Sequence, residues 1–419
     1  MAGSGLWYRC QSEGACVPSL TIVATENVGH TPVRVAVVGL GSFGLTFVPL
    51  YSKHPDVARV ILCDPDEKRL GQVARAFGIY DTRASLDEVL ADPDIDAVHL
   101  VTPMQIHAEQ SVAVLDAGKH CACAVPAAVS LDELHGLVAA EARSGCNYMM
   151  METAVYTQEF LHARGLLDSG DLGRIQFLRG AHYSDYEAWP PWKWYPPMSY
   201  ATHAVAPLLQ LADAEAVSVR CLGSGVMPKS LAGPTGNPFP VETAIFELEG
   251  GLAAEVTRSI FRMTRQVQES FSVYGEHASF EWQQIAGESP VVFRLADPEA
   301  ENEAFVLQRQ SFGAMLGIDT EALDELVPVS RFPSVTFEHA TLGPTDTDLP
   351  EALRGAAGHG GAESHLVNEF VRSIVEGRPS SVRAAVAAAW TAPGLCAHES
   401  ALRGGQPMAI PQFRHDSLA

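Results

Sequence analysis

The fold of this chain is decided by the stretch Val33-Arg34-Val35-Ala36-Val37-Val38-Gly39-Leu40-Gly41-Ser42-Phe43-Gly44. Its first part is rich in valine, which is typical of a buried parallel strand. The glycines that follow have the spacing G-x-G-x-x-G, which permits a tight turn, close approach of backbone to a pyrophosphate, and close helix packing. A helix that begins near Ser42 directs free N–H groups and the positive end of its dipole at that phosphate. We therefore expect the cofactor-binding loop to consist of Gly39, Gly41, Ser42, Phe43 and Gly44.

The kind of dinucleotide is indicated by the end of the next apolar run, Val60-Ile61-Leu62-Cys63-Asp64. A carboxylate at Asp64 accepts hydrogen bonds from both ribose hydroxyls of an adenosine and repels a 2′-phosphate. No arginine directly follows Asp64, because the next residues are Pro65, Asp66 and Glu67. The sequence therefore predicts NAD rather than NADP. A strand, turn and helix without a ligand is the alternative, since glycine-rich turns alone are common.

Length and composition limit the class of protein. The chain has 419 residues, which is too long for one ordinary domain, and a net charge of −22. This acidic balance argues against nucleic acid or an anionic membrane as a partner. No apolar run reaches membrane-spanning length, and residues 1–32 do not resemble a signal peptide, so we expect a cytoplasmic protein. The eight cysteines are scattered without metal-ligand spacing to histidines, so we expect reduced thiols and no metal.

The pattern of apolar residues changes along the chain. Residues 33–151 alternate short apolar runs with amphipathic segments, among them helices at 67–77, 105–117 and 131–142, and this succession predicts a doubly wound parallel sheet. After a helix at 156–167, strands are expected at 174–183, 217–222, 241–249, 252–259, 271–274 and 279–283. Turn signals between these strands predict an antiparallel or mixed sheet with one covered face. Residues 296–303 and 341–361 are expected to be loops, and helices at 363–376 and 382–402 end the pattern.

We therefore predict an α/β protein in three parts. Residues 1–32 are a flexible extension, residues 33–151 are an NAD-binding domain, and residues 152–419 are a substrate-binding and oligomerisation domain of the α+β type. The second domain is expected to hold a large open, mainly antiparallel sheet. Because an open sheet face or edge commonly needs a partner, we expect a homo-oligomer.

Loops at the carboxyl ends of the parallel strands should meet the reacting end of the cofactor. They contain Thr102-Pro103, with His107 in the following helix, and Ala124-Val125-Pro126, neither of which supplies a group that exchanges a proton at neutral pH. Glu152 and Tyr156 follow the last strand and can exchange one. Their alternatives are a carboxylate that satisfies helix N–H groups and a buried aromatic with a satisfied hydroxyl.

A second candidate region runs from Trp189 to His203. Its prolines and aromatic rings predict a stiff loop whose flat apolar faces suit a sugar or cyclitol, so Trp189, Trp192 and Trp194 are candidate substrate-binding residues. A packing lid or subunit contact is the alternative. Tyr200 and His203 have i, i+3 spacing, which places both on one side of a helix, where together they could move a hydroxyl proton. His359 lies in Gly358-His359-Gly360-Gly361, where backbone can approach a ligand closely.

From Val33 onward the chain resembles the glucose–fructose oxidoreductase/inositol dehydrogenase/MocA (Gfo/Idh/MocA) family over nearly its whole length. The residues that carry the resemblance are Val37 to Gly44, Thr102-Pro103 with His107, Ala117-Gly118-Lys119-His120 and the segment around His359. The resemblance implies a Rossmann NAD-binding domain followed by an open-faced sheet domain. It also implies an enzyme that oxidises or reduces a ring hydroxyl of a sugar or cyclitol, often as an oligomer.

The resemblance also separates branches of this family. The usual dehydrogenase pattern has Glu-Lys-Pro with a catalytic lysine, where this chain reads Ala124-Val125-Pro126. Val125-Pro126-Ala127-Ala128, Tyr148 to Glu152 with Tyr156, and Tyr200 to His203 resemble the NAD-dependent glycosidases of glycoside hydrolase family 109. That branch implies oxidation at C3, elimination of the aglycone, addition of water and return of the hydride. It implies proton transfer by Tyr156, places Tyr200 and His203 at the oxidised hydroxyl, and usually has Glu at the position of Ala124.

The sequence thus predicts an NAD-dependent oxidoreductase acting on a ring hydroxyl of a sugar, glycoside or cyclitol. Tyr200 and His203 are expected to handle the proton in place of a lysine, with Tyr156 and Glu152 in support, while Val125, Thr102, Pro103 and His107 border the cofactor. A redox-neutral glycosidase and a non-catalytic NAD or sugar sensor are the two alternatives.

Overall fold

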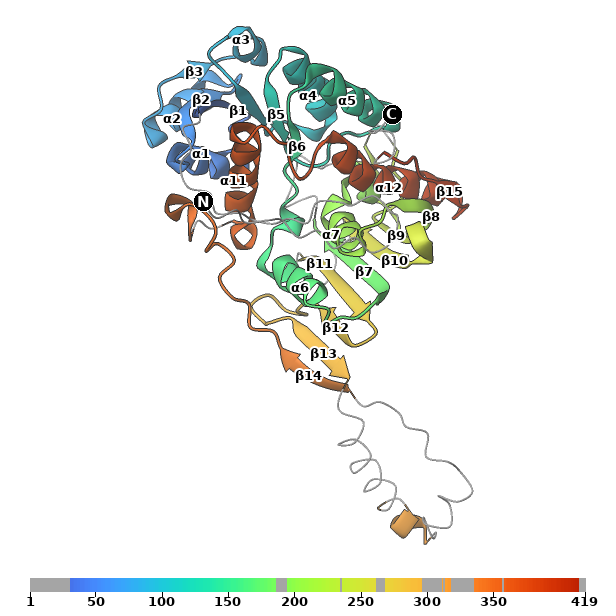
Figure 1. The fold of residues 1–419 in the computed structure, drawn as a ribbon. Coiled ribbons are helices and arrows are strands. Elements are labelled where there is room, and N and C mark those ends of the chain that lie inside the picture. Colours follow the sequence, from blue (N-terminus) through green and yellow to red (C-terminus); the bar gives the residue numbers. More distant parts are fainter. Residues whose placement is uncertain are drawn as a thin grey trace.

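In the computed structural model the chain forms two β-sheets whose helices pack between and around them (Figure 1). The structure describes residues 31–185, 194–233, 236–260, 268–295, 311, 313–317, 335–355 and 358–413. Within these residues, no helix is both long enough and apolar enough to cross a bilayer.

The first sheet has six parallel strands in the order β3-β2-β1-β4-β5-β6. Its strands are β1 (Val33–Val38), β2 (Val57–Cys63), β3 (Thr82–Arg83), β4 (Ala97–Leu100), β5 (His120–Cys123) and β6 (Tyr148–Met150). Helices α1 (Gly44–Lys53), α2 (Glu67–Phe77), α3 (Leu86–Ala91), α4 (His107–Asp116) and α5 (Leu131–Ser144) connect them. The helices cover both faces, which is why β1 and β4 are almost wholly buried and rich in apolar residues.

Local signals place the helix ends of this domain. The side chain of Asp66 accepts a hydrogen bond from the Arg69 amide at 3.0 Å at the start of α2, and Gly78 ends that helix in the left-handed conformation. Ser130 and Gly145 do the same for α5. A side-chain oxygen satisfies an N–H group that the helix leaves open, and glycine adopts the left-handed conformation without strain.

Among the described residues the second sheet has nine strands in the order β14-β13-β12-β11-β7-β10-β9-β8-β15, all antiparallel except the pair β7 and β10. They are β7 (Ile175–Tyr183), β8 (Ala216–Ser224), β9 (Val241–Leu248), β10 (Ala253–Ser259), β11 (Gln268–Gly275), β12 (Ala278–Glu281), β13 (Val291–Leu295), β14 (Val335–His339) and β15 (Met408–Ala409). The predicted α/β fold with a parallel sheet and a large, mainly antiparallel sheet is therefore confirmed.

One face of the second sheet is covered by helices α6 (Gln158–Asp168), α7 (Thr202–Ala212) and α12 (Ala384–Leu402) (Figure 1). The approach of α7 is close enough to require a glycine: a Cβ at Gly180 of β7 would lie 2.3 Å from the Ala204 carbonyl oxygen of α7. Buried and more exposed residues alternate along β7 and β9, as expected when only one face of a sheet is packed.

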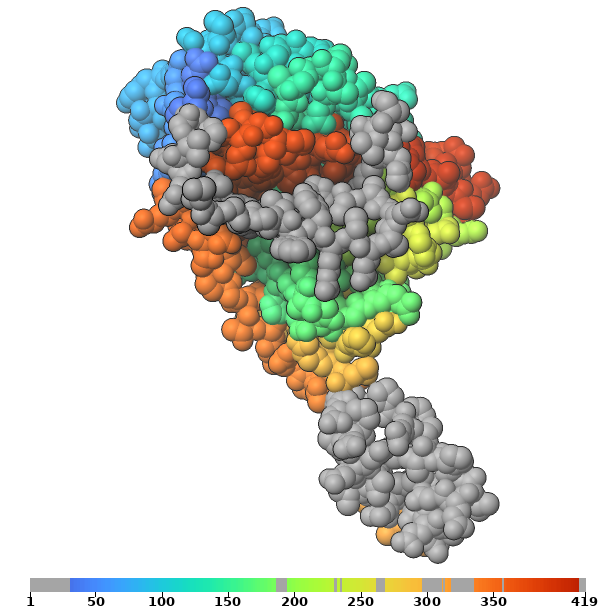
Figure 2. Space-filling view, viewed as in Figure 1, coloured from blue at the N-terminus to red at the C-terminus, as the bar shows by residue number. Residues whose placement is uncertain are grey.

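The last helices return to the first sheet. Helix α11 (Ala362–Val375) packs on α1, and α12 packs on both α5 and β8. In Figure 2 these orange and red segments lie between the blue-to-teal first sheet and the green and yellow second sheet. The C-terminal helices therefore help to fix the two sheets relative to one another.

Short elements lie between the longer ones. These are α8 (Lys229–Ala232) and the 3-10 helices η1 (Met104–Ile106), η2 (Thr153–Val155), η4 (Pro197–Tyr200), η5 (Glu249–Gly251), η6 (Glu351–Leu353) and η7 (His359–Gly361). The segment 341–361, expected as loop, thus contains η6 and η7. Strands β13 and β14 were not predicted from the sequence. Strand β14 is exposed at every position, so it lacks the alternation of buried and exposed residues that is typical of a half-buried strand.

Candidate active site

The glycine loop after β1 has the geometry that a dinucleotide requires. Gly39 has a φ of +95°, and a Cβ there would lie 2.4 Å from the Val101 carbonyl oxygen. A Cβ at Gly44 would lie 2.0 Å from the Gly39 carbonyl oxygen, whereas one at Gly41 would meet nothing within 4 Å. Two glycines therefore allow the turn and the helix contact, and the third leaves open space beside the loop. No side chain caps α1, so the loop residues Ser42 and Phe43 lead into a helix start suited to a phosphate.

Asp64 lies at the end of β2 and is buried. Its carboxylate accepts hydrogen bonds from the amide of Leu40 and the amide of Asp66, both at 2.9 Å, so it also ties the glycine loop to β2. Arg69, on the first turns of α2, places Nη1 3.4 Å from Asp64 Oδ2. The sequence reasoning considered only the residues directly after Asp64 and so missed Arg69, which one turn of helix brings back to the carboxylate.

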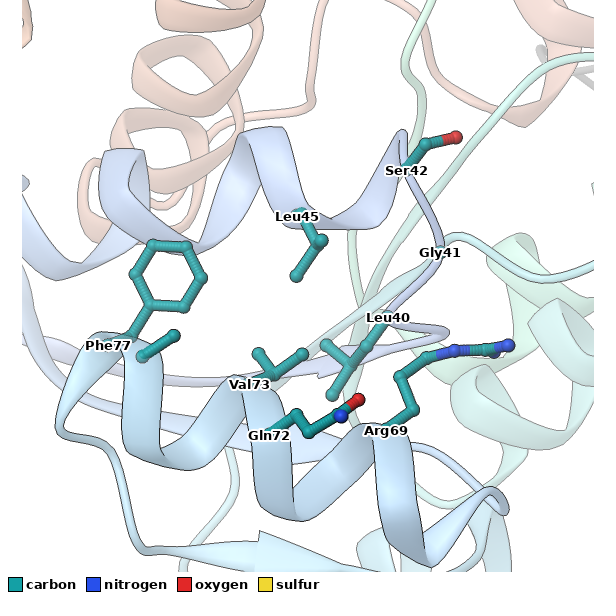
Figure 3. A pocket seen from close by; sticks show the side chains of 9 residues that line it. Leu40, Gly41, Ser42, Leu45, Arg69, Gln72, Val73 and Phe77 are labelled. Atoms are coloured by element: carbon teal, nitrogen blue, oxygen red, sulfur yellow. The ribbon is translucent and has the colours of Figure 1, made fainter.

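An open hollow of about 430 Å³ lies beside this loop, between α1 and α2. Figure 3 shows Phe77 and Leu45 at one end of the hollow and Ser42, Gly41 and Leu40 along its rim, with the Arg69 side chain extending past Leu40. Its lining contains neither Tyr200 nor His203. The hollow therefore borders the cofactor loop and lies apart from the candidate proton-transfer groups.

His107 joins two loops at the carboxyl ends of the parallel strands. Its Nδ1 lies 2.8 Å from the Pro126 carbonyl oxygen and its Nε2 lies 2.8 Å from the Thr102 carbonyl oxygen. Two carbonyl acceptors require a proton on each ring nitrogen. Burial lowers the pKa of His107, but Cys123 and the hydrogen bonds to the two carbonyl oxygens outweigh burial and raise the pKa to about 9. His107 thus holds the loop of Thr102 and exposed Pro103 against that of buried Val125, whose peptide bond to Pro126 is cis.

Tyr200 is held in place through its backbone by the second sheet. Arg258, fully buried on β10, donates from Nε to the Tyr200 carbonyl oxygen at 2.9 Å. Glu242, fully buried on β9, accepts from the Met198 amide at 2.8 Å. Helix α12 packs against the same turn at Gly394, where a Cβ would lie 2.1 Å from the Met198 carbonyl oxygen. Three elements, β9, β10 and α12, therefore hold the turn that carries Tyr200.

Tyr200, His203 and Glu152 form a connected chain of polar groups. The Tyr200 hydroxyl lies 3.2 Å from His203 Nε2, and His203 Nδ1 forms a short hydrogen bond with Glu152 Oε1. Burial lowers the pKa of His203, but the carboxylates of Glu152 and Glu269 outweigh it and raise the pKa to about 9. Burial, together with those carboxylates, raises the pKa of Tyr200 well above its usual value. The structure thus brings together three of the predicted catalytic residues, and two of them, Tyr200 and His203, hold their protons at neutral pH.

The carboxylate of Glu152 accepts hydrogen bonds from two neighbours. Its Oε1 also accepts a hydrogen bond from the Ala154 amide at 3.0 Å, the helix-start role that the sequence left open as an alternative. Oε2 is buried and has no hydrogen-bond partner among the residues that the structure describes. The bond with the Ala154 amide therefore supports the structural interpretation of Glu152, and the bond with His203 supports the functional one.

Two further groups that the sequence reasoning missed face the same rings. His182, on β7, has its ring centre 5.3 Å from that of His203, and burial lowers its pKa well below the usual value. Glu269, on β11, places Oε1 3.6 Å from His182 Nε2 and 3.9 Å from His203 Nε2. The signal that could have found them is a polar residue at an inward position of a strand: Glu269 has the same parity as buried Phe271 and Val273.

His359 lies at the junction of this cluster and the cofactor loop. Its ring packs edge-on against the Phe43 ring, with centroids 5.7 Å apart, and its Nδ1 lies 2.6 Å from Glu363 Oε1. The hydrogen bond that Glu363 accepts, with the charge of Glu269 as a further cause, raises the pKa of His359. His359 and Glu363 therefore form a second histidine–carboxylate pair next to the first.

The remaining predicted residues lie elsewhere. The Tyr156 hydroxyl bonds to Ser381 Oγ at 2.8 Å and its ring stacks on His365, so its described contacts do not include Tyr200 or His203. Trp194 is 43% exposed and packs against Gly233, while Trp189 and Trp192 lie outside the described residues. In the part of the chain that the structure describes, no three His, Cys, Asp or Glu side chains are grouped as a metal site would require.

Two protein-family models together match most of the chain between residues 33 and 281. The "Oxidoreductase family, NAD-binding Rossmann fold" matches residues 33–152, and the "GFO/IDH/MocA C-terminal domain" matches residues 160–281. The chain belongs to the Gfo/Idh/MocA family of NAD-binding oxidoreductases. This membership confirms the resemblance seen in the sequence, and with it the prediction of NAD.

This Gfo/Idh/MocA protein has relatives of two kinds. A glycosyl hydrolase family 109 protein of Porphyromonas gingivalis is 24% identical over 91% of this chain and 84% of the relative. Levoglucosan dehydrogenase, solved with NADH and levoglucosan, has a TM-score of 0.71 at 19% identity over 91% of this chain and all (100%) of that one. Myo-inositol 2-dehydrogenase from Lactobacillus plantarum has a TM-score of 0.66 at 17% identity over 91% of this chain and 100% of the neighbour. At these identities the solved structures show the shared fold.

Proposed function

We propose that this protein moves a hydride between NAD and a ring carbon of a sugar, glycoside or cyclitol, with Tyr200 and His203 at the reacting oxygen. The observation that carries the proposal is the buried chain from the Tyr200 hydroxyl through His203 to Glu152. The neighbours solved with levoglucosan or named for inositol support the substrate class. We further propose that it works in the cytoplasm as a homo-oligomer.

The residues around the glycine loop fit the dinucleotide. Gly41 leaves open space, α1 has an uncapped start, and Asp64 follows β2 beside the loop, a position that supports recognition of an adenosine ribose. When bound there, NAD supplies the hydride acceptor or donor. The side chains of Tyr200 and His203 then have to orient the hydroxyl and manage its proton.

The polar chain gives Tyr200 and His203 defined roles. With both ring nitrogens protonated, His203 donates through Nδ1 to Glu152 and through Nε2 to the Tyr200 oxygen, so the Tyr200 hydroxyl accepts from His203 and acts as a donor through its own O–H. In this state the Tyr200 hydroxyl, polarised by His203, donates a hydrogen bond to a carbonyl oxygen and stabilises negative charge on it. Glu152 holds the imidazole in one orientation, as a carboxylate does in a catalytic triad.

A second candidate is redox-neutral cleavage of a glycoside. The relative from Porphyromonas gingivalis, which is similar over 91% of this chain, bears a glycosyl hydrolase name. The pair of His359 and Glu363 offers a second proton carrier, which departure of an aglycone requires. In that reaction the hydride returns to the sugar, so no NADH accumulates.

One experiment separates these functions. The purified protein is assayed for bound NAD(H), then given NAD⁺ with levoglucosan, myo-inositol or p-nitrophenyl glycosides. Formation of NADH supports the oxidoreductase, whereas release of p-nitrophenol without NADH supports the glycosidase. Tyr200→Phe is expected to lower kcat by about 10² or more while leaving the affinity for NADH unchanged. Unchanged turnover in this variant contradicts the role of Tyr200, and NAD binding without any hydride exchange points to a sensor.

A further inference from the structure

Oxidation of a hydroxyl requires a group that accepts its proton, and the described groups differ in their ability to do so. Tyr200 and His203 hold their protons at neutral pH. Lysine is absent from the loop Ala124-Val125-Pro126. Glu152 is fully buried behind His203, on the Nδ1 side of the ring, and is shielded from a substrate.

Glu269 lies on the Nε2 side of the same ring. It stands opposite His182 in the antiparallel pairing of β11 with β7, and its Oε1 lies 3.9 Å from His203 Nε2. The contacts at 3.6 and 3.9 Å are too long to be hydrogen bonds. No hydrogen bond of the Glu269 side chain is found within the described residues, so the structure holds this carboxylate near the rings without engaging its oxygens.

Exposure distinguishes the two carboxylates that flank His203. The side chain of Glu269 is 26% exposed and that of Glu152 is 0% exposed. Of these two carboxylates, only Glu269 therefore has surface that a substrate can reach. Its charge also acts on all three candidate proton-transfer groups, because it raises the pKa of Tyr200, of His203 and of His359.

A purely structural role for Glu269 is poorly supported by its surroundings. Its cross-strand neighbour His182 is neutral, because burial and Arg258 both lower the pKa of that ring. Arg258 is directed toward the Tyr200 carbonyl oxygen and Ser184. The charge of Glu269 is thus directed at the site rather than at a structural partner.

We propose that Glu269 is the carboxylate that accepts the proton of the substrate hydroxyl while Tyr200, held by His203, binds the oxygen. The inference rests on the proposed function. In the oxidation, the O–H bond breaks and its proton bonds to a Glu269 oxygen. The electron pair left on the substrate oxygen forms the C=O bond as the ring carbon gives its hydride to the oxidised nicotinamide dinucleotide. In the reverse direction protonated Glu269 returns the proton. Glu269 thereby replaces the lysine of the usual dehydrogenase pattern.

The test compares Glu269→Gln with Glu281→Gln. Glu281 lies on the neighbouring strand β12, where it accepts a hydrogen bond from the Tyr274 hydroxyl, away from the rings. Glu269→Gln keeps the size of the side chain but cannot take a proton. It is expected to lower kcat by about 10² or more with whichever probe is turned over among levoglucosan, myo-inositol and the p-nitrophenyl glycosides. The control is expected to match the wild type, and both variants should bind NADH with unchanged affinity.

A second readout needs no substrate. In protein labelled with ¹³C at histidine, with His203→Gln used for assignment, Glu269→Gln is expected to lower the pKa of His203 by about 1 or more. A kcat within twofold of the wild type overturns the proposal, and so does an unchanged pKa of His203. If the wild type turns over no probe, the proposed function fails, and the histidine titration alone decides whether Glu269 acts on His203.

Discussion

The glycine loop and the ring cluster differ in how their residues come together. The loop from Gly39 to Gly44 is one continuous segment, and its geometry follows from contacts with Val101 and within itself. The cluster of Tyr200, His203, Glu152, His182 and Glu269 comes from η4, α7, the end of β6, β7 and β11. A site within one segment is encoded by local spacing, whereas a site built from five segments depends on how two sheets and their helices pack.

The largest effect is expected in the loop. Gly39→Ala places a Cβ 2.4 Å from the Val101 carbonyl oxygen at a φ of +95°. We expect the free energy of unfolding to fall by about 3 kcal/mol or more, with loss of NADH binding, because both the clash and the left-handed conformation are unfavourable. Urea denaturation and NADH fluorescence measure the two effects.

Gly41→Ala is the matched control within the same loop. Because nothing lies within 4 Å of its Cβ, stability should change by less than about 0.5 kcal/mol. The affinity for NADH should still fall, by roughly tenfold, since the methyl group occupies the space where backbone approaches a pyrophosphate. Unchanged NADH affinity in this variant would contradict the assignment of that space.

In the ring cluster, Glu152→Gln tests how the packed carboxylate controls His203. The folded-state pKa of His203 is about 9, above the usual 6.5 of an unfolded chain, so its stabilisation is full below pH 6.5 and is lost as pH rises through 9. Removing the charge of Glu152 should reduce the loss of stability between pH 6.5 and 9 and lower kcat about tenfold or more. His107 titrates in the same range in both proteins, so it cancels from the comparison. An identical pH dependence of unfolding in both proteins would refute the coupling.

Tyr156→Phe asks whether Tyr156 belongs with the cluster or with the surrounding core. The variant loses the hydroxyl bond to Ser381, so we expect about 1 kcal/mol of lost stability and a kcat within about threefold of the wild type. A large loss of kcat with unchanged stability would instead support the proton-transfer role that the sequence predicts for Tyr156.

The smallest effect is expected at Arg69. This side chain is about half exposed and lies 3.4 Å from Asp64, which already accepts two backbone hydrogen bonds. Arg69→Ala should therefore change NADH affinity by only about threefold, because exposed ion pairs are weak. A change of tenfold or more, measured by NADH fluorescence, would make Arg69 a main cofactor contact.

Much of the fold could be predicted where signals are local. Helix α2 begins and ends where the sequence predicts, because Asp66 caps it and Gly78 stops it. The prediction of a helix near Tyr200 and His203 was right about their shared side but missed that Tyr200 ends η4 and His203 lies in α7. Glu269 was missed because the predicted strand began at Phe271, two residues too late to include it.

The sequence by itself determined the two kinds of sheet, the glycine loop for NAD and the shared side of Tyr200 and His203, because these depend on periodicity, glycine conformation and spacing along one segment. Only the tertiary structure decided that Glu152 and Glu269 flank His203, that Tyr156 turns to Ser381, and that His359 joins Phe43. The physical reason is that the protonation of a buried ring depends on charges within a few ångströms in space. Here the neighbouring carboxylates come from strands and helices far apart in the chain.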